Sequence, residues 1–212
     1  MNSTRRRHII PISLMLFTAF SARALWLDQQ SFWYDEAFSV WLAAKSFGDI
    51  TWHMLAVDSN TPAHYWLLKA WLAMAGGSDF CARLLSVFGG VTAAALATLL
   101  PSRTARVPAV ICCGAIALWP ALVQIGQDAR TYAWMGAAVV ASTAALSRAL
   151  TRNARKAWWT WALFTVLTVG MHIMGIGVFV AQLMVAAGWV WKSDRARRSA
   201  RIAASIIPVA AC

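Results

Sequence analysis

Long apolar runs separated by short basic clusters dominate the chain. The first run, residues 9–27, follows three consecutive arginines. A helix needs about twenty apolar residues to cross a bilayer, so this run predicts a transmembrane helix. Five further runs predict five more, at 80–100, 107–125, 131–150, 157–171 and 173–191. The last run, 202–212, has about half the required length, and we expect it to be a truncated seventh span.

Residues 28–79 are mixed rather than purely apolar and hold six of the eight acidic residues. We expect one large external loop that contains three short helices, at 35–47, 49–57 and 62–75. The segment 58–62 (DSNTP) is typical of a helix cap before the third of them. That third helix is short for a span, so we expect it to lie along or dip into the membrane interface.

The distribution of Lys and Arg decides whether the third loop helix crosses the membrane. If it does not cross, the N-terminus and the connections 102–106, 148–156 and 192–201 are cytoplasmic. These segments hold fourteen of the nineteen basic residues and a single acid, Asp194. If the helix crossed, every later connection would change sides and the positive-inside bias would be lost. The charges therefore favour a cytoplasmic N-terminus and an external loop at 28–79.

Composition agrees with an all-α polytopic membrane protein that forms one membrane domain over residues 1–212. The chain is 60% hydrophobic and 13% charged, which is outside the range of soluble globular domains. Its net charge of +11 does not indicate nucleic acid, because the basic residues lie between apolar runs rather than on one solvated face. The four cysteines lie in or beside apolar runs, without metal-ligand spacing.

The first apolar run also resembles a secretory signal. Basic residues precede it, and Ala22, Arg23 and Ala24 could form a cleavage site. The many later spans favour an uncleaved anchor instead. In both cases the basic end stays cytoplasmic, so the residues that follow the run lie outside.

Two adjacent acids, Asp35 and Glu36, follow the first run and are preceded by Trp33 and Tyr34. They could simply begin a helix, where acids complement the helix dipole. The aromatic pair favours the wall of an interfacial pocket. A carboxylate pair beside a membrane is costly to desolvate and suits proton or metal chemistry. One carboxylate could take a proton from an acceptor hydroxyl, while the other orients the acceptor, binds sugar hydroxyls or holds a divalent cation.

The segment 126–132 (GQDARTY) lies at the expected outer mouth of the third and fourth spans. Asp128 is suited to cap the next helix, although it could equally bind substrate. Arg130 opposes the dipole of a helix that begins here. Its position is best explained by a neighbouring anion, either a phosphate or the carboxylates of the first loop.

Further polar residues are expected on the same side. His64 and Tyr65 begin the third loop helix, and His64 is as suited to a structural hydrogen bond as to a ligand. Lys69, one turn later, could extend to the interface or bind a lipid phosphate. Arg83 lies near the start of the next span. As for Arg130, its position would be explained by a neighbouring anion. His172, between two later spans, is expected to be structural.

Four motifs then occur in a characteristic order: DEA at 35–37, PAHYW at 62–66, RLLSVFG at 83–89 and QDARTY at 127–132. Together they resemble the N-terminal half of membrane-embedded glycosyltransferases of the C superfamily. The resemblance is to bacterial relatives of the dolichyl-phosphate-mannose protein mannosyltransferases and of the aminoarabinose lipid A transferases. That family commonly has two prolines after a histidine in the second motif, whereas here Pro62 precedes His64.

The resemblance implies transfer of a sugar, mannose or a similar hexose or pentose, from a polyprenyl-phosphate donor. The acceptor would be a lipid, glycan or protein on the outer face, and the anomeric centre would be inverted. In this scheme Asp35 is the general base, Glu36 supports it, and Arg130 stabilises the leaving phosphate. The other substrate-binding candidates are His64, Tyr65, Lys69, Arg83, Asp128 and Tyr132. The scheme requires no cofactor, although it allows a divalent cation.

Two other functions stay open. A transporter or lipid-handling protein would place charges or Gly/Pro breaks midway through its spans, whereas here the charges gather at the ends and in one loop. An inactive or non-catalytic fragment of a transferase would agree with the short last run. The Ala-rich spans suggest a bacterial inner membrane.

Overall fold

The computed structural model describes residues 3–58, 60–100, 109–152 and 154–206, with side chains described between residues 9 and 192. Within these ranges the protein is all-α, with ten α-helices and one π-helical turn. The helices are α1 (Ser3–Ala24), α2 (Tyr34–Ala43), α3 (Phe47–Trp52) with the π turn η1 (His53–Val57), α4 (Ala63–Ala75), α5 (Asp79–Ala97), α6 (Ala109–Leu118), α7 (Pro120–Ile125), α8 (Tyr132–Arg152), α9 (Arg155–Met171) and α10 (Gly175–Ile206).

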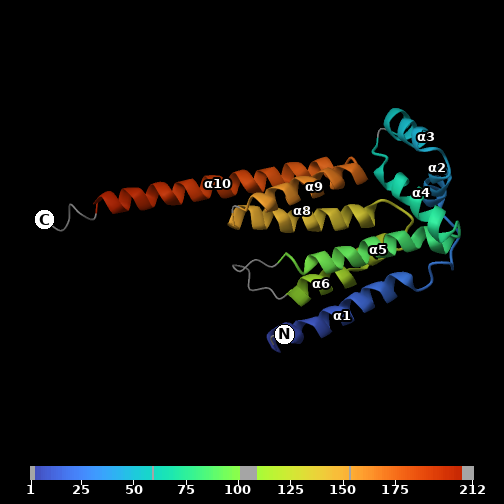
Figure 1. Ribbon diagram of the computed structural model, residues 1–212, viewed down its shortest axis with the longest axis horizontal. Coiled ribbons are helices and arrows are strands. Elements are labelled where there is room, and N and C mark those ends of the chain that lie inside the picture. The colour runs from blue at the N-terminus through green and yellow to red at the C-terminus, as the bar shows by residue number, and fades with distance from the viewer. Residues whose placement is uncertain (1–2, 59, 101–108, 153, 207–212) are drawn as a thin grey trace.

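Six of these helices, α1, α5, α6, α8, α9 and α10, run side by side as an elongated bundle (Figure 1). The short helices α2, α3 and α4 gather at one end of it, which we call the loop end. The first residues of α1, the end of α8 and the start of α9 lie at the opposite end. By length and composition, three of the described helical segments could cross a membrane, Asp79–Ala97, Tyr132–Arg152 and Gly175–Lys192.

Small residues form the contact between α5 and α8 at the centre of the bundle. Buried alanines line both helices, among them Ala82 and Ala93 on α5 and Ala141 on α8. A Cβ atom added to Gly89 would lie 3.0 Å from the backbone nitrogen of Trp134, so the two backbones approach too closely for a larger residue. Such close contact is typical of membrane helices, whose association depends on packing rather than on burial from water.

The predicted third span, 107–125, is not one continuous helix. It breaks between α6 and α7 at Trp119 and Pro120. Proline has no N–H to donate back to the carbonyl of Ile116, so the helix cannot continue through it. The prediction of an unbroken helix is therefore wrong at this position, and the carbonyl groups that the break frees need another donor.

Arg23 of α1 supplies that donor. Its side chain is fully buried, and its Nη1 donates to the carbonyls of Ala19 and Ala117 at 3.0 and 2.8 Å. Its Nη2 donates to the carbonyls of Ile116 and Leu122 at 3.1 and 3.3 Å. The sequence had suggested Arg23 only as part of a cleavage site. In the structure it joins α1 to the broken helix, which argues that α1 belongs to the folded bundle.

The predicted break before a seventh span does not occur within the described residues. Helix α10 continues without interruption from Gly175 to Ile206. The predicted connection, 192–201, contains neither Gly nor Pro and is rich in Ala and Arg, which favour helix. Residues 207–212 of the predicted half span lie outside the described residues.

Replacement of Arg23 by Leu should destabilise the bundle. It would leave buried carbonyl groups at the break of α6 without donors, at a cost of about 1 to 3 kcal/mol for each unsatisfied group. The measurement is thermal unfolding of the purified protein in detergent. The matched control is Arg152→Leu, because Arg152 is exposed at the end of α8. An Arg23→Leu variant as stable as the control would contradict the capping role.

Candidate functional site

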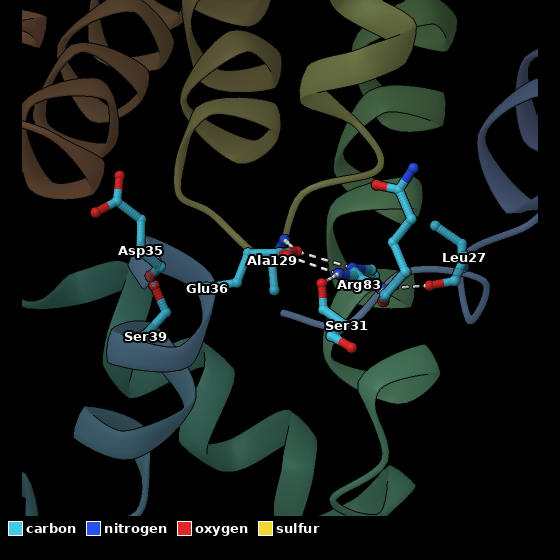
Figure 2. A network of polar contacts seen from close by, with 8 residues as sticks. Leu27, Ser31, Asp35, Glu36, Ser39, Arg83 and Ala129 are labelled. Atoms are coloured by element: carbon cyan, nitrogen blue, oxygen red, sulfur yellow. Dashed lines mark hydrogen bonds and ion pairs between the residues drawn. The ribbon is translucent and has the colours of Figure 1, made fainter. Parts of the chain in front are cut away.

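A buried ion pair joins three segments at the loop end. Nε and Nη2 of Arg83, in the first turns of α5, donate to the two carboxylate oxygens of Glu36 at 2.8 and 2.6 Å. The Glu36 side chain is 1% exposed and the Arg83 side chain 7%. The backbone N–H of Ala129, in the connection between α7 and α8, donates to the same carboxylate at 2.8 Å (Figure 2). We call this arrangement the Glu36 clamp.

The remaining donors of Arg83 hold the segment between α1 and α2. Nη1 donates to the carbonyl oxygens of Leu27 and Gln30, and Nη2 donates to that of Ser31 at 3.3 Å. The guanidinium also lies over the ring of Phe32, 5.0 Å from its centre. Every nitrogen of Arg83 is thus engaged within the protein. In this arrangement Arg83, a substrate-binding candidate from the sequence, has no donor left for a phosphate.

The electrostatics of the clamp favour the ionised form of Glu36. Burial alone would raise its pKa, but the hydrogen bonds from Arg83 and Ala129 and the charge of Arg83 outweigh that effect. The pKa of Glu36 is therefore lowered, and the carboxylate holds no proton to donate at neutral pH. Glu36 acts as a structural anion that fixes α2 against α5 and the connection 126–131.

Asp35 points away from the clamp, although it adjoins Glu36 in the sequence (Figure 2). Its side chain is 36% exposed, and its Oδ2 lies 3.4 Å from Nη2 of Arg130. Nη1 of Arg130 donates to the backbone carbonyl of Asp35 at 3.2 Å. The Asp35–Arg130 pair therefore combines an accessible carboxylate with a mostly buried guanidinium. The sequence analysis placed both residues in the same site, and the structure brings them into contact.

Arg130 has unused hydrogen-bonding capacity in a buried setting. Its Nε is buried and has no partner among the described residues. The guanidinium lies 5.7 Å from the ring centre of Tyr132, another predicted site residue. A buried donor without a partner costs roughly 1 to 3 kcal/mol. An oxygen-rich ligand beside Arg130 would remove that cost.

His64 is close enough to Arg130 to experience its charge, and its side chain forms no hydrogen bond with the described residues. It is 1% exposed, and neither ring nitrogen has a partner among the described residues. Burial, together with the charge of Arg130, lowers the pKa of His64 to about 3. His64 is therefore neutral, and one of its nitrogens carries a proton for which the described residues supply no acceptor. Tyr65 packs edge-on against it, with ring centres 5.4 Å apart, and burial raises the pKa of Tyr65.

Further contacts connect the end of α9 to the segments that surround Asp35 and Arg130. Oδ1 of Asn60 accepts from the backbone N–H of Ile173, and the hydroxyl of Thr131 donates to the carbonyl of Met171 at 2.7 Å. These bonds tie the end of α9 and the residues that follow it to the segment before α4 and to the connection that carries Arg130. His172 is buried, its Nδ1 accepts from the N–H of Met174, and its ring packs on Tyr132. These contacts agree with the structural role expected for it.

Two predicted site residues lie apart from Asp35. Lys69 sits near the other end of α2, where its Nζ donates to the carbonyl of Ala43 at 3.4 Å and lies over the ring of Phe47. Asp128 lines a cavity on the far side of the Glu36 clamp. Its carboxylate forms no hydrogen bond with the described residues, so it does not cap α8, which begins at Tyr132. Burial and then the charge of Glu36 raise the pKa of Asp128.

That cavity has a volume of about 870 Å³ and lies between the segment after α1 and helix α7. Glu36 and Arg83 form part of its wall, so the clamp separates it from Asp35. The sequence did not lead us to expect this cavity. A signal was present, because four of the five glutamines in the chain lie in two short segments, 29–30 and 124–127, at the ends of predicted spans. No cluster of three metal-ligating side chains occurs in the part of the chain that the structure describes.

Stability should fall in mild acid because His64 is held neutral. A histidine with a lowered folded-state pKa adds stability above its unfolded value, about 6.5, and that stability is lost as the pH falls towards 3. The expected slope between about pH 6 and pH 5 is roughly 1.4 kcal/mol per pH unit. Unfolding of the wild type and of His64→Phe at several pH values measures it.

The variant should lose most of this slope. The control is His53→Phe, which removes a less buried histidine from η1 and should keep the slope. Equal slopes in the wild type and in His64→Phe would mean that His64 is accessible to protons, contrary to the structure.

The protein was compared with known families and structures. No protein-family model, no curated protein and no solved structure gave a match to this chain. The resemblance to the C-superfamily glycosyltransferases therefore stays a prediction from the four motifs and their order.

Proposed function

We propose that this protein is a membrane glycosyltransferase that moves a sugar from a polyprenyl-phosphate donor to an acceptor on the outer face, with inversion. The observation that carries the proposal is the Asp35–Arg130 pair. A carboxylate with 36% exposure lies 3.4 Å from a guanidinium whose buried Nε has no partner in the described part of the chain. This arrangement supplies a base and an anion-binding group side by side.

The proposal includes six membrane spans: α1, α5, the broken helix α6 and α7, α8, α9 and α10. Its support is the agreement between the charge pattern and the arrangement of the helices. Arg148, Arg152, Arg155 and Lys156 lie around the connection of α8 to α9, at the end opposite α2, α3 and α4. Basic residues mark the cytoplasmic side, so the loop end would face outward, as in a bacterial inner membrane.

In the proposed reaction, Asp35 accepts the proton of the acceptor hydroxyl. The acceptor oxygen attacks the anomeric carbon of the sugar as the bond from that carbon to the phosphate oxygen breaks. The phosphate leaves with the electron pair of that bond, and Arg130 stabilises the negative charge that develops on it. The attack comes from the face opposite the phosphate, so the configuration inverts.

His64 contributes to the same phosphate site. Because its ring is neutral and buried, it would donate one N–H to a phosphate oxygen rather than add a full charge. The proton without an acceptor and the unpartnered Nε of Arg130 would then be satisfied together. Tyr132 packs under Arg130 and would limit its rotation, while Glu36 positions α2 rather than joining the chemistry.

The direct test is sugar transfer by the full chain in membrane vesicles, with radiolabelled polyprenyl-phosphate mannose, glucose and arabinose as donors. Asp35→Asn should lower the rate by about 10² to 10⁴, the usual contribution of a general base. The matched control is Asp49→Asn, because Asp49 is an exposed acid of α3 that should leave transfer unchanged.

Transfer by Asp35→Asn at the wild-type rate would overturn the catalytic assignment. Movement of the labelled lipid across the vesicle membrane without any transferred product would favour the transporter alternative. Normal membrane insertion and an unchanged melting temperature of Asp35→Asn separate a chemical effect from misfolding.

A further inference from the structure

The cavity on the far side of the Glu36 clamp has the size of a ligand site and no role in the proposed chemistry. Its volume of about 870 Å³ lies within the range of small-molecule pockets, roughly 300 to 1,000 Å³. Asp35, Arg130 and His64 do not line it. Its walls come from the segment after α1, the start of α2, Arg83 of α5, and the region from α7 to Asp128.

Amide side chains give this cavity its polar character. Gln29, Gln30, Gln124 and Gln127 all line it, which leaves only one glutamine of the chain elsewhere. Gln127 uses its Nε2 to donate to the carbonyls of Ala22 and Leu25, at 3.4 and 3.3 Å. Its side-chain oxygen stays available to accept. The other three glutamines form no side-chain hydrogen bonds within the described part of the protein. Together they offer both donors and acceptors, as a ligand with many hydroxyl groups requires.

The charges of the lining residues disfavour an anion. Arg83 is the only cation in the lining, and each of its nitrogens is engaged by Glu36 or by backbone carbonyls. Asp128 brings a carboxylate that accepts no hydrogen bond from the residues that the structure describes. A phosphate group here would meet that carboxylate and find no free guanidinium. The cavity therefore differs from the Asp35 side, where Arg130 has donor capacity to spare.

Two exposed indole rings complete the lining. Trp26 and Trp33 are 76% and 51% exposed. Trp26 has a φ of 60°, in the left-handed region that a residue with a large side chain rarely adopts. Such a conformation costs about 1 to 2 kcal/mol, so other contacts must maintain it. Strained residues of this kind cluster at binding sites. An exposed indole at a polar cavity presents an apolar face on which a sugar ring can pack.

We propose that this cavity binds a neutral saccharide. The glutamine amides and the Asp128 carboxylate would hydrogen-bond its hydroxyl groups, and Trp26 or Trp33 would pack against the face of a sugar ring. The site is separate from the proposed phosphate site because the Glu36 clamp lies between them. The inference concerns binding alone, so it does not depend on the proposed transferase activity.

Saturation-transfer NMR on the full chain in phosphatidylcholine nanodiscs tests this inference. The probes are methyl α-mannoside, methyl β-galactoside and sucrose, with mannose 1-phosphate as an anionic counterpart and empty nanodiscs as the blank. At least one neutral probe should show saturable binding. In an Arg130→Gln background, which removes the proposed phosphate site, mannose 1-phosphate should bind at least tenfold more weakly than methyl α-mannoside. Absence of saturable binding for all neutral probes at millimolar concentrations would overturn the proposal, as would preferred binding of the phosphate in that background.

Variants of the lining residues test whether the saccharide binds in this cavity. Asp128→Asn and the double variant Gln29→Ala with Gln30→Ala should each weaken saccharide binding at least tenfold. The double variant is the safer one for folding, because both side chains are exposed and the backbone carbonyl that Gln30 offers to Arg83 is kept. Asp49→Asn is the matched control and should bind as the wild type does. Wild-type affinity in the double variant would contradict the assignment to this cavity.

The outcome also separates this inference from the transferase proposal. Saccharide binding that survives Asp35→Asn while transfer is lost would support both assignments. Transfer that continues when neutral saccharides fail to bind would overturn only the saccharide site.

Discussion

A pair of opposite charges taken out of water is tolerated only when nearly every hydrogen-bonding position around it is satisfied. Glu36 and Arg83 meet this condition, because Ala129 donates to the carboxylate and three backbone carbonyls before α2 accept from the guanidinium. The clamp thereby fixes α2, the start of α5 and the connection from α7 to α8 to one another. Segments far apart in the sequence are thereby held in fixed positions relative to one another at the loop end.

The clamp divides the loop end into two regions with different chemistry. On one side Asp35 contacts Arg130, and an anion is favoured by the donors of Arg130 and His64 that have no partner among the described residues. On the other side the glutamines, Asp128 and the two indole rings favour a neutral polar ligand. The geometry of helix α2 produces this division, because the side chains of consecutive helix residues, here Asp35 and Glu36, point in different directions. Asp35 and Glu36 are neighbours in sequence, yet they belong to different surroundings.

Periodic and compositional signals predicted most of the fold. The apolar runs and the three loop helices lie close to the observed α1, α2, α3, α4, α5, α8 and α9. A contact of Arg130 with the carboxylates of the first loop was one of the two alternatives that the sequence offered, because a cation at the start of a helix opposes the helix dipole. Hydropathy could not show that Pro120 breaks a helix or that Arg23 caps the break, because a mean over many residues hides the effect of any single one. It also could not tell which of two adjacent acids is buried, since that depends on the position of Arg83 in the folded chain.

The central claim is that the Glu36 clamp holds the loop end in its functional geometry. A double-mutant cycle on the unfolding free energy, with Glu36→Gln, Arg83→Gln and the double variant, measures it most directly. Each single variant leaves a buried group without its partner and should cost about 3 to 5 kcal/mol, and the double variant should cost much less than the sum of the two. Single costs below about 1 kcal/mol that simply add would show that the pair is not buried and does not organise the site.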